Sequence, residues 1–168
     1  MNTLMHAVTT LEWREPVARE PHYELRSGDD LLATLALEPL RRTLATVRTP
    51  EGTWTFLQTG ILSATVYVRE EGSSQDLAVF QPGFLGRGTL RFGNGVRFRW
   101  RRAPHHGGWS FLGGDGETVL TLRLRPVPAG EPWPHRLQGE VHLGPAGHSN
   151  PRVPLLAALA WYLVLMDQ

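Results

Sequence analysis

VPLLAALAWYLVLMDQ, residues 153–168, contains a single charged side chain, that of Asp167. Leucine and alanine, both strong helix formers, dominate the stretch, and neither glycine nor proline interrupts it after the opening Val-Pro. The composition predicts a helix over residues 154–166, with Ser149 or Asn150 as its N-terminal cap. Apolar residues cover every side of this helix, so all of its faces must be buried, either in lipid or in protein.

Length separates these two possibilities. At about 1.5 Å per residue the predicted helix spans roughly 20 Å, whereas a hydrocarbon core about 30 Å thick needs about 20 residues. Arg152 is the only basic residue nearby, so the stretch lacks the basic cluster that flanks a cytoplasmic anchor. We therefore expect the helix to be buried inside the protein and not to span a membrane.

The rest of the chain has the pattern of short strands. Alternating apolar and polar residues recur between Leu11 and Leu143, separated by glycine, proline and aspartate. The strongest hairpin signals are TLRFGNGVRFRWRR (residues 89–102) and WSFLGGDGETVLTLRLR (residues 109–125). Roughly a dozen strands joined by short turns, without internal repeat or domain linker, predict a single domain over residues 1–168.

A dozen strands and one apolar helix define the expected fold class, which is all-β. An empty barrel of about twelve strands would have a lumen too wide for its own side chains to fill. The prediction is a closed antiparallel barrel of roughly twelve strands that encloses the hydrophobic helix of residues 154–166. A lipocalin-like carrier of apolar ligands is disfavoured, because the helix occupies the lumen.

A resemblance to a known family rests on these segments: YELRSGDDLLATL (23–35), GTWTFLQTG (52–60), RFRW (97–100), WSFLGGDGETVLTL (109–122) and PLLAALAWYLVLMD (154–167). Over most of residues 20–168 the chain resembles the tubby-like superfamily, which includes the tubby C-terminal domain, the phospholipid scramblases and the LURP-one-related proteins. Within the superfamily, these segments most resemble the local sequence pattern of the LURP-one-like members. The resemblance implies a barrel around a central C-terminal helix. It also implies anionic phospholipid headgroups as a ligand class, bound by basic residues on the barrel exterior.

Charge is unevenly distributed along the chain. All 17 basic residues are arginine, which is typical of a GC-rich genome, and the net charge is +1. Residues 1–84 carry 7 arginines against 11 acids, whereas residues 85–168 carry 10 arginines against 5 acids. The absence of cysteine excludes disulfides and thiolate metal sites, and MNTLMHAVTTLEW lacks the features of a signal peptide. We therefore expect a cytoplasmic protein.

The second half contains the best candidate binding site. Between Arg87 and Arg102 there are six arginines and no acid, and alternation places Phe98 and Trp100 inward and the arginines between them outward. Guanidinium groups match phosphate oxygens in pairs and stay charged at cellular pH. The predicted anion-binding residues, on this outer face and the strands that follow, are Arg91, Arg97, Arg99, Arg101, Arg123 and Arg125.

This candidate site favours a non-enzymatic binding or scaffold module. Its predicted ligand is an anionic phospholipid headgroup or a protein partner, and its predicted location is cytoplasmic or peripheral to a membrane. An ordinary solvated barrel exterior would show the same arginines. Nucleic acid is disfavoured as a partner because Trp54, Trp100 and Trp109 fall on the inward phase of their strands.

The alternative function is a metal-dependent enzyme. His22 and Glu24 share one face of a strand, as do Glu140 and His142. If the two strands were adjacent, their imidazoles and carboxylates would form a plausible zinc or iron site. Solvent-facing alternation explains the same pattern without a metal, so no metal site is predicted and the metal-dependent enzyme remains only the alternative.

Other motifs do not indicate catalysis or a cofactor. No serine lies in a G-x-S-x-G elbow, and the glycines of PGFLGRGTLRFGNG are not followed by a helix. The resemblance to scramblases does not extend to calcium, because an aspartate-rich loop with alternating oxygen ligands is missing. His105 and His106 are adjacent, and sequence neighbours seldom converge on one metal. No cofactor is predicted.

Overall fold

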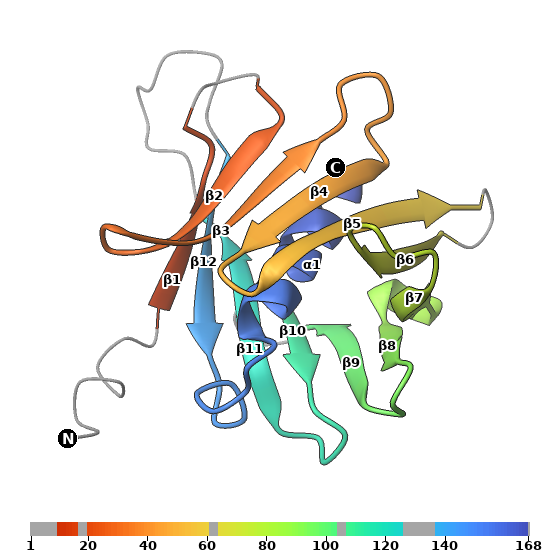
Figure 1. Ribbon diagram of the computed structural model, residues 1–168. Helices are drawn as coiled ribbons and strands as arrows, with labels where there is room; N and C mark the ends of the chain where they lie inside the picture. Colours follow the sequence, from red (N-terminus) through yellow and green to blue (C-terminus); the bar gives the residue numbers. More distant parts are fainter. Residues whose placement is uncertain (1–9, 17–19, 61–63, 104–106, 126–136, 168) are drawn as a thin grey trace.

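The computed structural model describes residues 10–16, 20–60, 64–103, 107–125 and 137–167. Its elements are, in chain order, β1 (Thr10–Arg14), β2 (His22–Ser27), β3 (Asp30–Leu37), β4 (Leu44–Thr49), β5 (Gly52–Thr59), β6 (Thr65–Glu70), β7 (Asp76–Pro82), the short 3-10 helix η1 (Phe84–Gly86), β8 (Gly88–Phe92), β9 (Arg97–Arg102), β10 (Trp109–Leu112), β11 (Thr118–Leu124), β12 (Gln138–Leu143) and α1 (Val153–Met166). Figure 1 shows the strands wrapped around α1.

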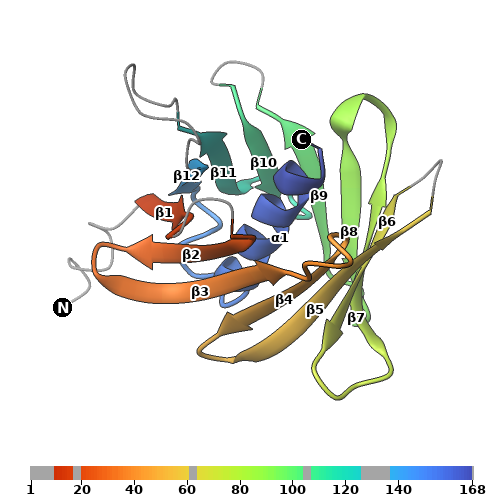
Figure 2. The same ribbon diagram turned by 90° about the horizontal axis from the view of Figure 1, so that it is seen from above.

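The strands form a closed antiparallel barrel. Each strand pairs with its neighbours along the chain, and β1 pairs with β12 to complete the ring. In the closing pair, Thr10 lies opposite His142 and Trp13 lies opposite Gly139. The predicted closed barrel of about twelve strands is confirmed, with α1 packed inside it (Figure 2).

α1 is buried on all sides, as its sequence predicts. It spans 14 residues, begins at Val153, one residue before the predicted start, and carries ten buried side chains. The predicted cap is wrong, because the residue before the helix is Arg152 and no side chain caps it. Instead the Asn150 side-chain oxygen accepts a hydrogen bond from the Arg152 backbone nitrogen at 2.9 Å and closes the preceding turn.

Aromatic side chains of α1 fill the lumen. Trp161 stacks on Trp13 of β1 with ring centroids 5.6 Å apart, and Tyr162 meets Phe56 of β5 edge-on at 5.6 Å. The Tyr162 hydroxyl donates a hydrogen bond to the backbone oxygen of Thr43, and burial raises the pKa of this tyrosine. These contacts hold α1 against β1, β5 and the residue that precedes β4.

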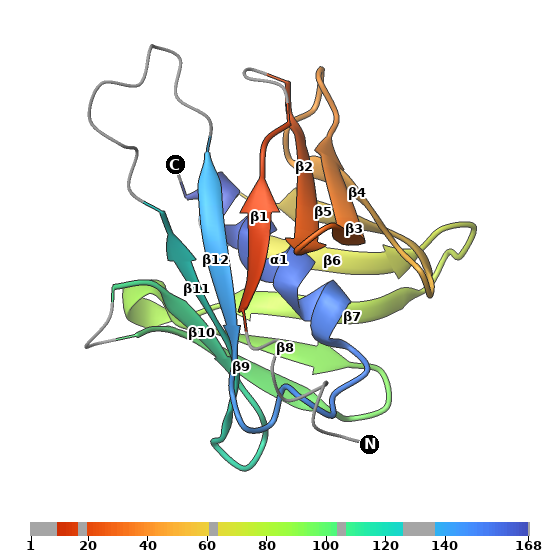
Figure 3. The same cartoon turned by 90° about the vertical axis from the view of Figure 1, so that its left-hand side faces the viewer.

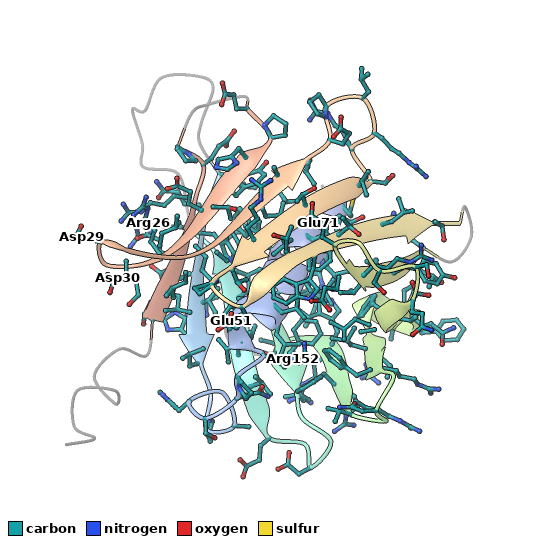
Figure 4. The ribbon with its side chains drawn as sticks, viewed as in Figure 1. Arg26, Asp29, Asp30, Glu51, Glu71 and Arg152 are labelled. Atoms are coloured by element: carbon teal, nitrogen blue, oxygen red, sulfur yellow. The ribbon has the colours of Figure 1, made fainter. Side chains whose placement is uncertain are left out.

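The two ends of the barrel differ in what they contain. Because neighbouring strands are antiparallel, odd-numbered strands finish at the end of the barrel where α1 finishes, and even-numbered strands finish at the end where α1 begins (Figure 3). Acidic turn residues gather at the end where α1 begins: Asp29 and Asp30 follow β2, Glu51 follows β4 and Glu71 follows β6 (Figure 4).

In the described part of the chain, no helix has the length and hydropathy required to cross a membrane.

Candidate functional site

Four of the six predicted arginines form one exposed surface on β8 and β9, which we call the unpaired wall: Arg91, Arg97, Arg99 and Arg101. Arg91 and Arg97 are directly opposite each other in the β8–β9 register. None of the four forms an ion pair with another described residue. Like charges directly opposite across two strands repel each other, so this surface favours an anion from outside the barrel.

Arg125, also a predicted member of the site, lies in a different environment. Its guanidinium contacts Glu12 at 2.8 Å and Glu140 at 3.0 Å, so it bridges two carboxylates that face each other across β1 and β12. It belongs to an ion-paired surface, which we call the paired wall, that comprises Glu12, Arg14, Glu24, Arg26, Arg125 and Glu140. Arg125 is therefore already neutralised, unlike the arginines of β8 and β9.

Arg123, the remaining predicted residue, lies between the two walls. It is opposite Glu140 in the β11–β12 register, yet it forms no ion pair with a described residue. Its Nε atom is buried without a hydrogen-bond partner. A buried guanidinium N–H without an acceptor carries a desolvation cost, and a bound oxygen would remove that cost.

Arg123 borders a pocket of about 240 Å³ on the outer face of β9–β12. We call it the oxyanion pocket. Its lining residues are Arg101, Ala103, Ser110, Thr118, Thr121, Arg123 and His142. Strand register brings these residues together, because Ser110 is opposite both Arg101 and Thr121, and Thr121 is opposite His142. The pocket thus combines two cations with hydroxyl groups on a rigid sheet.

The hydrogen-bonded hydroxyls of Ser110 and Thr121 have one hydrogen available for a ligand. Ser110 Oγ and Thr121 Oγ1 are 2.9 Å apart, so one hydroxyl donates to the other and the second hydrogen stays available. Ser110 is 5% exposed, whereas Thr121 is partly exposed, which places the free donor most simply on Thr121. Together with two guanidinium groups, this donor matches the oxygens of a phosphate.

His142 positions the edge of this pocket. Its Nδ1 lies 3.3 Å from Thr10 Oγ1 and its Nε2 lies 3.2 Å from Glu140 Oε2, so both ring nitrogens are occupied. Ser110 is hydrogen-bonded to Thr121 and to no imidazole. The oxyanion pocket therefore offers groups that can anchor an oxyanion, and the His142 imidazole contacts Thr10 and Glu140 instead of Ser110.

The metal site considered from the sequence is not assembled. β1 lies between β2 and β12, so the strand that carries His22 and Glu24 is not adjacent to the strand that carries Glu140 and His142. Glu24 is paired with Arg26 at 2.8 Å, and Glu140 with Arg125. Among the described residues, no group of three or more histidines, aspartates and glutamates is arranged to hold a metal ion. The expectation for His105 and His106 lies outside the described residues.

Sequence reasoning found the arginines of the oxyanion pocket but missed its other members. Alternation already indicates that Ser110 and Thr121 face outward, since Phe111 and Leu120 face the core. Alternation does not predict the strand register that places Ser110 between Arg101 and Thr121.

Comparison of the chain with family models, curated proteins and solved structures found no match in any of the three.

Proposed function

We propose that this protein is a non-enzymatic binding module for a phosphate-bearing anion, with the oxyanion pocket as its centre and the unpaired wall as its electrostatic surround. The resemblance to the tubby-like superfamily suggests a phospholipid headgroup as the phosphate, and hence a cytoplasmic protein at the periphery of a membrane. The observation that carries the proposal is Arg123, whose buried Nε lacks an acceptor beside a second cation, Arg101.

The strength of such a site follows from its donors. Hydrogen bonds that involve a charged group contribute about 1.5–3 kcal/mol each, and about 1.4 kcal/mol corresponds to a tenfold change in affinity. The unpaired wall adds a longer-range attraction that salt weakens, because its arginines are exposed and near one another. Binding is therefore expected to depend both on specific pocket residues and on ionic strength.

The test is titration calorimetry with inositol hexakisphosphate, followed by sedimentation with phosphatidylcholine vesicles that contain or lack a phosphatidylinositol phosphate. Arg101→Gln and Arg123→Gln are each expected to weaken binding of the soluble probe about tenfold or more. Arg14→Gln removes the same charge from the paired wall and is the matched control. Binding that is unchanged in both pocket variants would overturn the proposal. Binding to the soluble probe without vesicle binding would retain the phosphate and reject the lipid.

A further inference from the structure

A second cavity, of about 500 Å³, opens at the end of the barrel where α1 finishes. Its walls come from the last turn of α1, the ends of β5 and β7, the loop that contains η1, and the ends of β9 and β10. It lies at the barrel mouth, whereas the oxyanion pocket lies on the outer face of β9–β12. Among the described residues, α1 thus fills the lumen and a cavity remains at this end.

The inner part of this mouth cavity is apolar and aromatic. Phe80 and Trp100 are buried and face it from the strands, while Leu163 and Met166 face it from α1. Trp109 lines one side. Such a surface suits a flat ring or an acyl chain, and the volume is in the range of about 300–1,000 Å³ that is typical of small-molecule sites.

Two arginines line the mouth cavity. The Arg102 guanidinium lies over the Trp109 ring, 5.6 Å from its centroid, and Arg87 follows the η1 loop. Neither arginine forms an ion pair with a residue in the described ranges. The cavity therefore combines apolar walls with two arginines that form no ion pair within the described ranges, and Asp167 lines the cavity on the side of α1.

The η1 loop leaves apolar groups exposed beside this cavity. Leu85 lines the cavity and yet is 87% exposed, and the neighbouring Phe84 is 92% exposed. Leu85 also has φ 58° and ψ 39°, a left-handed conformation that is unfavourable for a residue with a side chain. A ligand with an apolar body would cover Leu85 and so offset part of the cost of holding it there.

We propose that the mouth cavity binds a small amphipathic anion, namely a molecule with an aromatic or acyl body and one carboxylate, sulfonate or phosphate group. The apolar body lies against Trp100, Phe80 and Met166, and the anionic group pairs with Arg87 and Arg102. Asp167 and the C-terminal carbonyls of α1 make the helix side negative, so the anionic group lies on the side of the arginines. This site is independent of the oxyanion pocket.

The experiment uses the whole protein and 1-anilinonaphthalene-8-sulfonate, an aromatic sulfonate whose fluorescence rises in an apolar site. Saturable binding at one site is expected, with energy transfer from the tryptophans. Decanoate is expected to displace the probe, whereas decanol, which lacks the charge, is expected to bind at least tenfold more weakly. Arg87→Gln and Arg102→Gln are each expected to weaken binding about tenfold, and Leu85→Ala to weaken it by a smaller factor.

Matched controls separate this site from other surfaces. Arg41→Gln removes an exposed arginine from the β3–β4 loop, and Leu40→Ala removes a 98% exposed leucine from the same loop; neither is expected to change binding. Arg101→Gln with Arg123→Gln is also expected to leave probe binding intact, so failure of the oxyanion pocket is distinguishable from failure here. Non-saturable probe binding, equal affinity for decanol and decanoate, or unchanged affinity in Arg87→Gln and Arg102→Gln would each overturn the proposal.

Discussion

The paired and unpaired walls each place two like charges directly opposite each other, but only the paired wall has an opposite charge between them. On the paired wall Glu12 and Glu140 are opposite each other, and Arg125 bridges both carboxylates at 2.8 and 3.0 Å. On the unpaired wall Arg91 and Arg97 are opposite each other, and no acid among the described residues bridges them. An external anion is therefore expected to bind most favourably at the unpaired wall. There it would lie between two arginines and reduce their repulsion, as Arg125 reduces the repulsion between two carboxylates on the paired wall.

The strands of both walls also pack closely against aromatic rings of the core. Each has a glycine where an aromatic ring presses against the strand, Gly139 on β12 against Trp161 and Gly88 on β8 against Phe80. A Cβ at Gly139 would lie 2.6 Å from a Trp161 ring carbon, and one at Gly88 would lie 2.2 Å from a Phe80 ring carbon. Trp161 is fully buried in the lumen, whereas Phe80 is buried but lines the mouth cavity.

The largest expected effect follows from this contrast. Gly139→Ala is expected to lower the free energy of unfolding by about 3 kcal/mol, and Gly88→Ala by about 1 kcal/mol, because only the second site can relax into a cavity. Urea unfolding of the two variants measures the difference. Equal losses, or a larger loss for Gly88→Ala, would show that Phe80 is as tightly confined as Trp161.

A smaller effect is expected from charge reversal on the two walls. The double variant Arg97→Glu with Arg99→Glu and the double variant Arg14→Glu with Arg125→Glu change the net charge equally. Removal of an arginine near an anionic membrane costs about 1 kcal/mol, so the first variant is expected to reduce vesicle binding by about 30-fold or more. The second is expected to change it by less than about threefold.

Co-sedimentation with phosphatidylserine-containing vesicles at low and high salt measures both variants. The loss in the first variant is expected to shrink as salt rises, because exposed charges are screened. A similar loss in both variants would mean that net charge alone governs binding, and the distinction between the walls would then carry no functional meaning.

The smallest effect concerns stability without any ligand. Glu12→Gln removes carboxylate contacts to Arg14 and Arg125 and is expected to cost about 0.5–1 kcal/mol. Thr89→Glu places an acid opposite Arg99 on the unpaired wall and is expected to add about 0.5 kcal/mol of stability while weakening anion binding. Thermal unfolding measures both. A destabilising Thr89→Glu, with the fold intact, would contradict the view that this wall lacks a counter-ion.

The sequence was sufficient for the parts of the fold that depend on local pattern. Residues 153–166 are apolar on every side and too short for a bilayer, and the buried helix α1 confirms that reasoning. Alternation in residues 97–102 likewise gives the outward arginines of β9, with Phe98 and Trp100 buried between them. Both inferences need only neighbours along the chain.

Inferences that need strand neighbours far apart in the chain could not be made in this way. The closing pair of the barrel joins Thr10 to His142, and nothing in either segment indicates that β1 separates β2 from β12. For this reason the proposed metal set of His22, Glu24, Glu140 and His142 was wrong in its geometry. The ion pair between Arg125 and Glu12 could not be predicted for the same reason, because it joins strands that are far apart in the sequence.

The order of the elements along the chain also determines when the core can form. α1 follows every strand, so the whole barrel wall leaves the ribosome before the helix that fills it. Until then the inner faces of β1 and β5 have no helix to pack against, and β1 must wait for β12 before the ring can close. The core can therefore form only after α1 has been made. Before that point the apolar strand faces are exposed, and exposed apolar surface makes an incompletely folded chain prone to aggregate.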